Sequence, residues 1–122
     1  MTTRALAPRE LGVLRATLEK AAKLELAPAL LGCLENLRVI GGCTCGCESI
    51  DFAERDSDRP PRPIADGIGK TPAGGDVGII VWGTDDAVMS LEVYDLGAGE
   101  LDIKLPVEAS IRPLPADDES PR

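Results

Sequence analysis

Residues 64–82 read IADGIGKTPAGGDVGIIVW, a segment with two apolar runs on either side of a proline- and glycine-containing turn. Ile64 to Lys70 is predicted to form a short strand, weakened by Gly67 and Gly69. Residues 77–82 are apolar on both faces, which is typical of a strand in the interior of a sheet. Between the two strands, residues 71–76 contain a proline and two adjacent glycines and have the length of a hairpin turn. The stretch therefore predicts an antiparallel hairpin whose second strand is interior.

The chain beyond this hairpin continues with a period of two. Residues 84–86 are predicted to turn, and the next strand, from Val88 to Leu96, separates apolar from polar side chains: Met89, Leu91 and Val93 against Ser90, Glu92 and Tyr94. Alternation of Leu101, Ile103 and Leu105 with polar residues predicts a last strand. The sum is an antiparallel β-meander of about four to five strands.

The N-terminal third has helical periodicity instead. Leucines and alanines at helical spacing predict a helix over residues 8–23, and Pro8 and Glu10 suit its first turn. A shorter helix is predicted from Pro28 to Asn36, burying leucines. We therefore expect an α+β fold, with an N-terminal helical hairpin packed on the meander. Residues 1–112 would form this single domain, and residues 113–122 a disordered acidic tail.

The inward parity of the chain changes around the segment Cys43-Thr44-Cys45-Gly46-Cys47. Val39 and Cys43 occupy odd positions, whereas Ile50 and Phe52 occupy even ones. Such a change requires a bulge or a tight turn. The sequence therefore predicts a bend between Cys45 and Ser49, with these four side chains pointing inward.

The cysteines are the residues with the most reactive chemistry, and three interpretations of them stay open. Four thiolates, Cys33, Cys43, Cys45 and Cys47, are the number that a structural zinc site requires. Alternate strand residues, however, lie about 6.6 Å apart, whereas thiolates on one zinc approach within about 4 Å. Cys43 and Cys45 are therefore expected to be small, buried, metal-free side chains, and no cofactor is predicted. A zinc site or a redox-active thiol is the alternative.

Other catalytic chemistry has little support. The chain has no histidine, which excludes Ser-His-Asp and Cys-His arrangements. Asp51 or Asp66, each flanked by apolar residues, could act as a base, but an aspartate beside a glycine more often caps a turn. Trp82 and Tyr94 could form an exposed aromatic pair, although cross-strand core packing is the more frequent role.

The charge of the chain is −8, and it is unevenly distributed. Residues 1–40 carry six basic and four acidic side chains, whereas residues 41–122 carry seven basic and seventeen acidic ones. An acidic body repels phosphate backbones, so no nucleic-acid partner is expected. The charge serves either solubility or the attraction of a basic protein partner, for which outward-facing Asp51, Glu92 and Asp102 are the candidate residues.

No segment has the ~18 consecutive apolar residues of a membrane span, and charges interrupt the N-terminus too often for a signal peptide. We therefore expect a cytoplasmic protein with no membrane partner. Reduced thiols in that compartment argue against two structural disulfides.

Three motifs within residues 37–96 carry a resemblance: CTCGCESIDF, PIADGIGKTPAGGDVGIIVWG and MSLEVYDL. They resemble a group of small uncharacterised bacterial proteins that share a CxCGC-x-[ST]-[IV]-D segment, a glycine-rich hairpin and an LE-x-Y strand. The resemblance implies a bacterial cytosolic protein and carries no activity, ligand or catalytic residue. The sequence thus predicts a non-enzymatic protein-interaction module that uses the acidic side of its sheet, and a cysteine-based metal or thiol-redox protein is the alternative.

Overall fold

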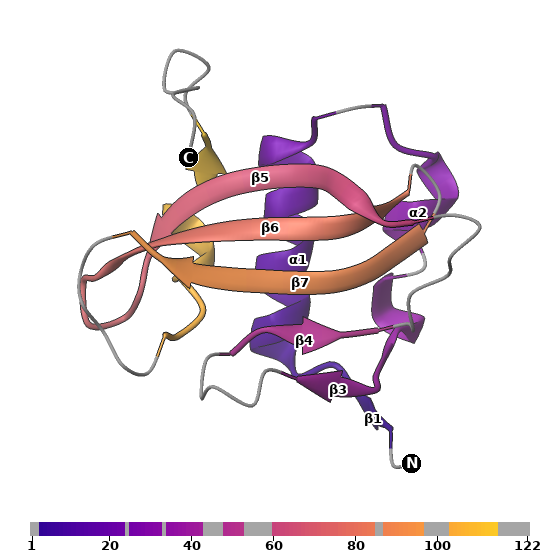
Figure 1. Cartoon of the computed structure of the whole chain (residues 1–122), viewed down its shortest axis with the longest axis horizontal. Helices are drawn as coiled ribbons and strands as arrows, with labels where there is room; N and C mark the ends of the chain where they lie inside the picture. Colours follow the sequence, from indigo (N-terminus) through magenta and orange to yellow (C-terminus); the bar gives the residue numbers. More distant parts are fainter. Residues whose placement is uncertain are drawn as a thin grey trace.

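An antiparallel sheet with one long helix across one of its faces forms the body of the molecule (Figure 1). The computed structural model describes residues 3–23, 25–32, 34–42, 48–52, 60–84, 87–96 and 103–114. Within them, six strands follow the order β3-β4-β7-β6-β5-β8. Their bounds are Gly41–Gly42 (β3), Ile50–Asp51 (β4), Arg62–Lys70 (β5), Asp76–Thr84 (β6), Ala87–Asp95 (β7) and Arg112–Pro113 (β8). A separate two-stranded sheet pairs β1 (Arg4–Ala5) with β2 (Arg38–Val39).

The predicted hairpin is present as β5 and β6, and β6 is interior, between β5 and β7. The Gly74 amide donates to the Thr71 carbonyl at 2.8 Å, which closes a turn that begins at Thr71 and has proline at its second position. Gly74 has a φ of +93°, in the left-handed region that favours glycine. Pro72 and Gly74 therefore stand where the turn geometry requires them.

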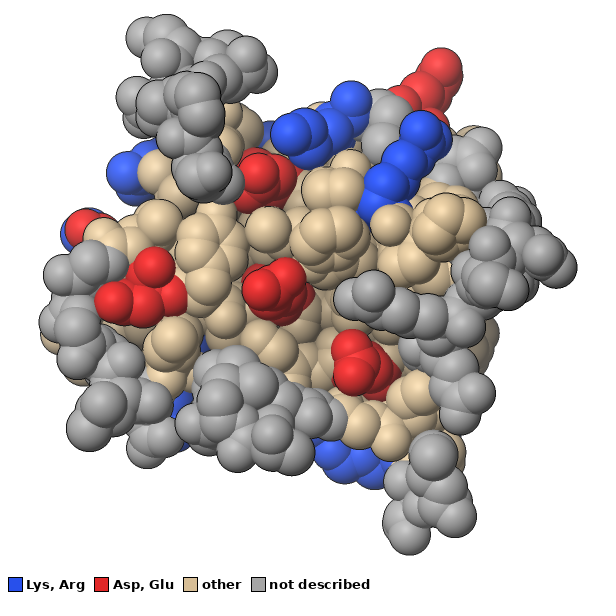
Figure 2. All heavy atoms as spheres, in the orientation of Figure 1, with Lys and Arg blue, Asp and Glu red and all other residues tan. Residues whose placement is uncertain are grey.

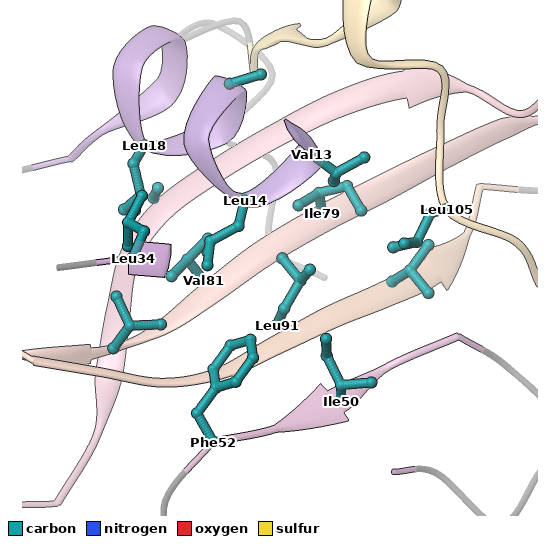
Figure 3. Close-up of a cluster of buried hydrophobic side chains, with 14 of the residues drawn as sticks. Val13, Leu14, Leu18, Leu34, Ile50, Phe52, Ile79, Val81, Leu91 and Leu105 are labelled. Atoms are coloured by element: carbon teal, nitrogen blue, oxygen red, sulfur yellow. The ribbon is translucent and has the colours of Figure 1, made fainter. Parts of the chain in front are cut away.

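The helix α1 (Pro8–Ala21) covers the face of the sheet that we call the inner face, and it packs against β5, β6 and β8. Figure 3 shows Val13, Leu14 and Leu18 of α1 pointing toward the strands. The side chains they meet are aliphatic, with Phe52 as the one aromatic among the core residues that the structure describes. Burial of this apolar surface stabilises the fold by roughly 25 cal/mol per Å².

The expected helical hairpin is not confirmed, because one long helix forms and not two. The predicted helix over residues 28–36 is divided into a five-residue helix, α2 (Pro28–Gly32), and a 3-10 turn, η1 (Leu34–Asn36). Gly32 is a poor helix former, and a helix this short is marginal without support. Of the three leucines predicted to be buried, Leu30 and Leu34 are buried in the core, and Leu31 is half-buried against it.

A bulge in β7 changes which of its side chains face inward. The pairing shifts from Trp82 opposite Ser90 to Gly83 opposite Val88, which leaves Met89 as the extra residue. Val88 is therefore buried and Met89 is half-buried. The alternation pattern predicts that Met89, Leu91 and Val93 share the apolar face. The prediction is confirmed for Leu91 and Val93, which are buried, and is wrong for Met89.

The chain reverses direction between Gly42 and Ile50, because β3 and β4 pair antiparallel. Val39, Ile50 and Phe52 are all buried, as the change of parity predicted. Cys43, Cys45 and the rest of the CTCGC segment lie outside the described residues, so their predicted orientation and their thiol chemistry stay predictions.

The predicted last strand around residues 101–105 is absent from its described part, residues 103–105. The Leu105 amide donates to the Glu48 Oε1 atom at 2.7 Å and not to a neighbouring strand, and Pro106 has no amide proton to donate. Among the described residues after β7, the strand that joins the sheet is β8, which pairs with β5 and whose Pro113 lies past the predicted domain end at residue 112. The Leu114 amide then donates to the Asp66 carbonyl at 3.3 Å.

Two glutamates tie the elements on the inner side together. Glu10 accepts two hydrogen bonds from Arg4, at 2.7 and 2.8 Å, and one from the Ala7 amide at 2.8 Å. Glu48 pairs with Arg9 of α1 and accepts the Leu105 amide, so that it joins the helix to the C-terminal segment. These charge-assisted bonds are stronger than neutral ones and fix the edges of the inner layer.

Candidate interaction surface

The face of the sheet opposite α1 carries no helix among the described residues, and Figure 1 shows it in front of α1. Residues paired across antiparallel strands point to the same side of a sheet, so the strand registers define what this face presents. We call it the outer face. Its members include Asp51, Asp66, Ile68, Gly78, Ile80, Trp82, Ser90, Glu92 and Tyr94, with Arg112 of β8 opposite Ile68.

An apolar stripe runs along the central strand β6 on this face. Ile80 and Trp82 are alternate residues of β6, and both are half-buried. The next alternate position of β6 is Gly78, and the ring of Tyr94 covers its backbone. A Cβ atom added at Gly78 would lie 2.1 Å from the Cζ atom of Tyr94. The stripe is therefore Trp82, Ile80 and the Tyr94 ring, and glycine provides the space for that ring.

Carboxylates flank the stripe on both sides. Asp66 of β5 and Glu92 of β7 are both paired with Ile80, one on each side. Their Cα atoms are therefore about 10 Å apart, two cross-strand spacings. The Trp82 Nε1 atom donates a hydrogen bond to Glu92 Oε1 at 2.8 Å. This bond fixes both the indole ring and the carboxylate on the surface.

Asp66 differs from Glu92 in having an unsatisfied oxygen. Its Oδ1 atom is buried and has no hydrogen-bond partner within the part of the chain described above, although the residue as a whole is half-buried. Asp66 lies within the nine-residue strand β5 and not in a turn, so the predicted turn-capping role is wrong. A buried acceptor without a donor costs about 1–3 kcal/mol. A donor from outside the chain would recover that cost.

The space-filling view shows how charge is distributed on this side of the molecule. Figure 2 shows acidic side chains emerging singly from an otherwise uncharged surface, with basic side chains toward its margins. Asp51 is exposed and lies opposite Ser90, and Arg112 is exposed on β8 opposite Ile68. The middle of the outer face is thus both apolar and acidic.

The structure brings two of the three predicted interaction residues, Asp51 and Glu92, to this one face. Asp102 lies outside the described residues, as do all four candidate metal ligands, Cys33, Cys43, Cys45 and Cys47. Among the residues that are described, no group of three or more histidine, cysteine or acidic side chains could hold a metal ion.

Sequence reasoning did not assign Ile80, Ile68 or Asp66 to a surface. The strand 77–82 was read as interior because it is apolar on both faces, and it is interior in the sheet order. The described residues contain one long helix, however, and it can cover only one face of the sheet. Counting the available covering layers would have identified the second apolar face of β6 as a candidate surface.

The outer face is separate from the ion pairs on the inner side. Burial raises the pKa of Glu48, but hydrogen bonds from Arg9 and from the Leu105 amide outweigh it and hold this pKa below its ordinary value. The hydrogen bond from Arg4 likewise lowers the pKa of Glu10 more than burial raises it. Both carboxylates are ionised partners within the fold and are not available to a ligand.

Comparison with family models, curated proteins and solved structures found no match to this chain. The resemblance to small bacterial proteins therefore stays a prediction. In the described ranges, no helix combines the length and the apolar character needed to cross a membrane.

Proposed function

We propose that this protein is a non-enzymatic interaction module whose outer face binds a basic protein partner. The observation that supports the proposal is the stripe of Trp82, Ile80 and the Tyr94 ring with Asp66 and Glu92 on its two sides. Apolar surface supplies binding free energy, and the carboxylates select for positive charge. A bacterial cytoplasmic location, inferred from the sequence, belongs to the same proposal.

The composition of the stripe matches that of known interaction sites. Tryptophan and tyrosine are enriched in the central parts of protein interfaces, where they contribute a large contact area at low conformational cost. Here both rings are held in place before binding, Trp82 by its bond to Glu92 and Tyr94 by its position over Gly78. Side chains ordered in advance lose less entropy when a partner binds.

The partner is expected to contact side chains and not to extend the sheet. The stripe lies on the central strand β6, whose two edges are already paired with β5 and β7. Addition of an extra strand needs a free edge. A basic amphipathic segment, with apolar residues for the stripe and cations for Asp66 and Glu92, has the required chemistry.

Trp82 provides the test, because it is the only tryptophan in the chain. The probe is a synthetic helical peptide of about 15 residues, with leucines along one face flanked by lysines. Titration should change the Trp82 fluorescence. The affinity should fall as the salt concentration rises from about 0.05 to 0.5 M, because the electrostatic screening length shortens from roughly 14 to 4 Å. A peptide with the same leucines and with glutamate in place of lysine is the control.

Two variants connect the binding to this face. Replacement of both flanking carboxylates, D66N/E92Q, should lower the affinity for the lysine peptide by at least about tenfold, which corresponds to about 1.4 kcal/mol of binding free energy. The matched control is E19Q/E25Q, which removes the same charge from residues outside the sheet. Equal losses of affinity in the two double variants would mean that binding depends on net charge and not on the outer face. Absence of binding by the wild-type protein would refute the proposal.

A further inference from the structure

Resting on the proposed function, we propose that Asp66 makes the outer face selective for arginine over lysine in its partner. The guanidinium group would be held by the Asp66 carboxylate between the two aromatic side chains of the stripe.

The first step is the unsatisfied oxygen of Asp66. The Oδ1 atom is buried without a hydrogen-bond donor, whereas Glu92 on the other side of the stripe already accepts the Trp82 indole proton. The terminal torsion of aspartate has a broad energy profile, so the carboxylate of this half-buried side chain can reorient toward an added donor. Of the two flanking carboxylates, Asp66 therefore gains more from an added donor.

The second step is the position of the aromatic rings around Asp66. Asp66 is paired with Ile80, and the diagonal neighbours of that pair along β6 are Gly78 and Trp82. The Tyr94 ring lies over Gly78. Diagonal positions on a sheet face are about 7–8 Å apart, within reach of aromatic side chains. A cation at Asp66 therefore lies between two positions of β6, that of Trp82 and that of Gly78 with the Tyr94 ring over it.

The third step is the chemistry of the two possible cations. The planar guanidinium of arginine presents several donors in a fixed fork, which matches both oxygens of a carboxylate, and its faces stack on aromatic rings. The ammonium of lysine is compact and strongly hydrated, and it offers no planar face. A carboxylate near aromatic positions and next to the half-buried apolar side chains of Ile68 and Ile80 suits arginine better.

The test uses the leucine–lysine peptide described above and a second peptide in which every lysine is replaced by arginine. Calorimetric titration of wild-type protein should give about tenfold tighter binding of the arginine peptide. In D66N the preference should fall below about twofold, because the neutral amide cannot pair with a guanidinium as a carboxylate does. A second variant, D66S, checks that the loss does not depend on the amide.

Asp51 provides the matched control, because it is an acidic side chain of the same face that is exposed and lies opposite Ser90. D51N should lower the affinities for both peptides to a similar extent, so the preference for the arginine peptide should remain. Thermal unfolding of each variant establishes that it is folded at the temperature of the titration.

The outcomes separate this inference from the proposed function. Equal, salt-dependent binding of the two peptides by wild-type protein overturns the arginine selectivity and leaves the interaction module intact. An arginine preference that persists in D66N and D66S overturns the role of Asp66. Failure of both peptides to bind refutes the proposed function, and the inference with it.

Discussion

The two faces of the sheet are made from the same strands and differ in almost every other property. On the inner face, Ile79, Val81 and Leu91 are 0% exposed and pack beneath α1. On the outer face, the neighbouring residues Ile80 and Trp82 are half-buried, with carboxylates beside them. The inner face is apolar, mainly aliphatic, and covered by α1, whereas the outer face contains two aromatic rings and is not covered by any described helix.

This difference shows that one strand can serve stability and recognition at once. Because alternate side chains point to opposite sides, β6 contributes Ile79 and Val81 to the core and Ile80 and Trp82 to the surface. An apolar residue in β6 is therefore not by itself evidence of a structural role. The predictions below test how far the two faces can be separated.

The largest effect is expected from a pair of matched substitutions in β6. Ile79→Ala should lower the free energy of unfolding by about 3 kcal/mol, because it leaves a cavity under α1. Ile80→Ala should lower it by about 1 kcal/mol, because that side chain is already partly in water. Urea unfolding followed by circular dichroism measures both values. Equal losses would mean that the outer face is as closed as the inner one.

The next largest effect concerns Gly78 and the Tyr94 ring. Gly78→Ala should cost about 2 kcal/mol, because the new methyl group would occupy the position of the ring and displace it. In a Tyr94→Ala background the same substitution should cost much less, and the double-mutant cycle gives the coupling. Two additive losses would show that the ring does not lie over Gly78 in solution.

The smallest effect tests the inner side by its pH dependence. The folded pKa of Glu48 lies below its ordinary value, which is about 4.3 in an unfolded chain. Its contribution to stability is therefore complete above the unfolded pKa and is lost as pH falls through the folded one. We expect E48Q to be about 1 kcal/mol less stable than wild type at pH 7, and the difference to shrink below about pH 5.

The control for E48Q removes one charge from the exposed pair of Arg15 and Glu35. E35Q should change the free energy of unfolding at pH 7 by less than about 0.5 kcal/mol, since exposed ion pairs contribute little. A difference between E48Q and wild type that stays constant from pH 7 to pH 3 would contradict the ionised bond between Glu48 and the Leu105 amide.

The local elements were largely predictable from the sequence. The hairpin of β5 and β6 follows from two apolar runs around Pro72 and Gly74, and the first helix follows from its leucine spacing. These features depend on local periodicity and turn chemistry, which a single sequence carries.

What could not be predicted depends on pairing between distant residues. The bulge at Met89 and the pairing of residues 112–113 with β5 follow from tertiary contacts. The end of α2 at Gly32 is a local effect that the predicted longer helix overlooked, because glycine is a poor helix former. The candidate surface was predicted in part, since Asp51 and Glu92 alternate outward. The role of Asp66 depends on the unsatisfied oxygen, which no sequence pattern reveals.

Methyl resonances of two adjacent isoleucines test the division between the faces most directly. Ile79 and Ile80 lie side by side in β6 and point to opposite sides. In a titration of isoleucine-methyl-labelled protein with the leucine–arginine peptide, we predict that the Ile80 methyl group and the Trp82 indole proton shift together to saturation, while the Ile79 methyl group changes little. Shifts of Ile79 equal to those of Ile80, or saturable binding that leaves Ile80 and Trp82 unchanged, would contradict recognition by the outer face.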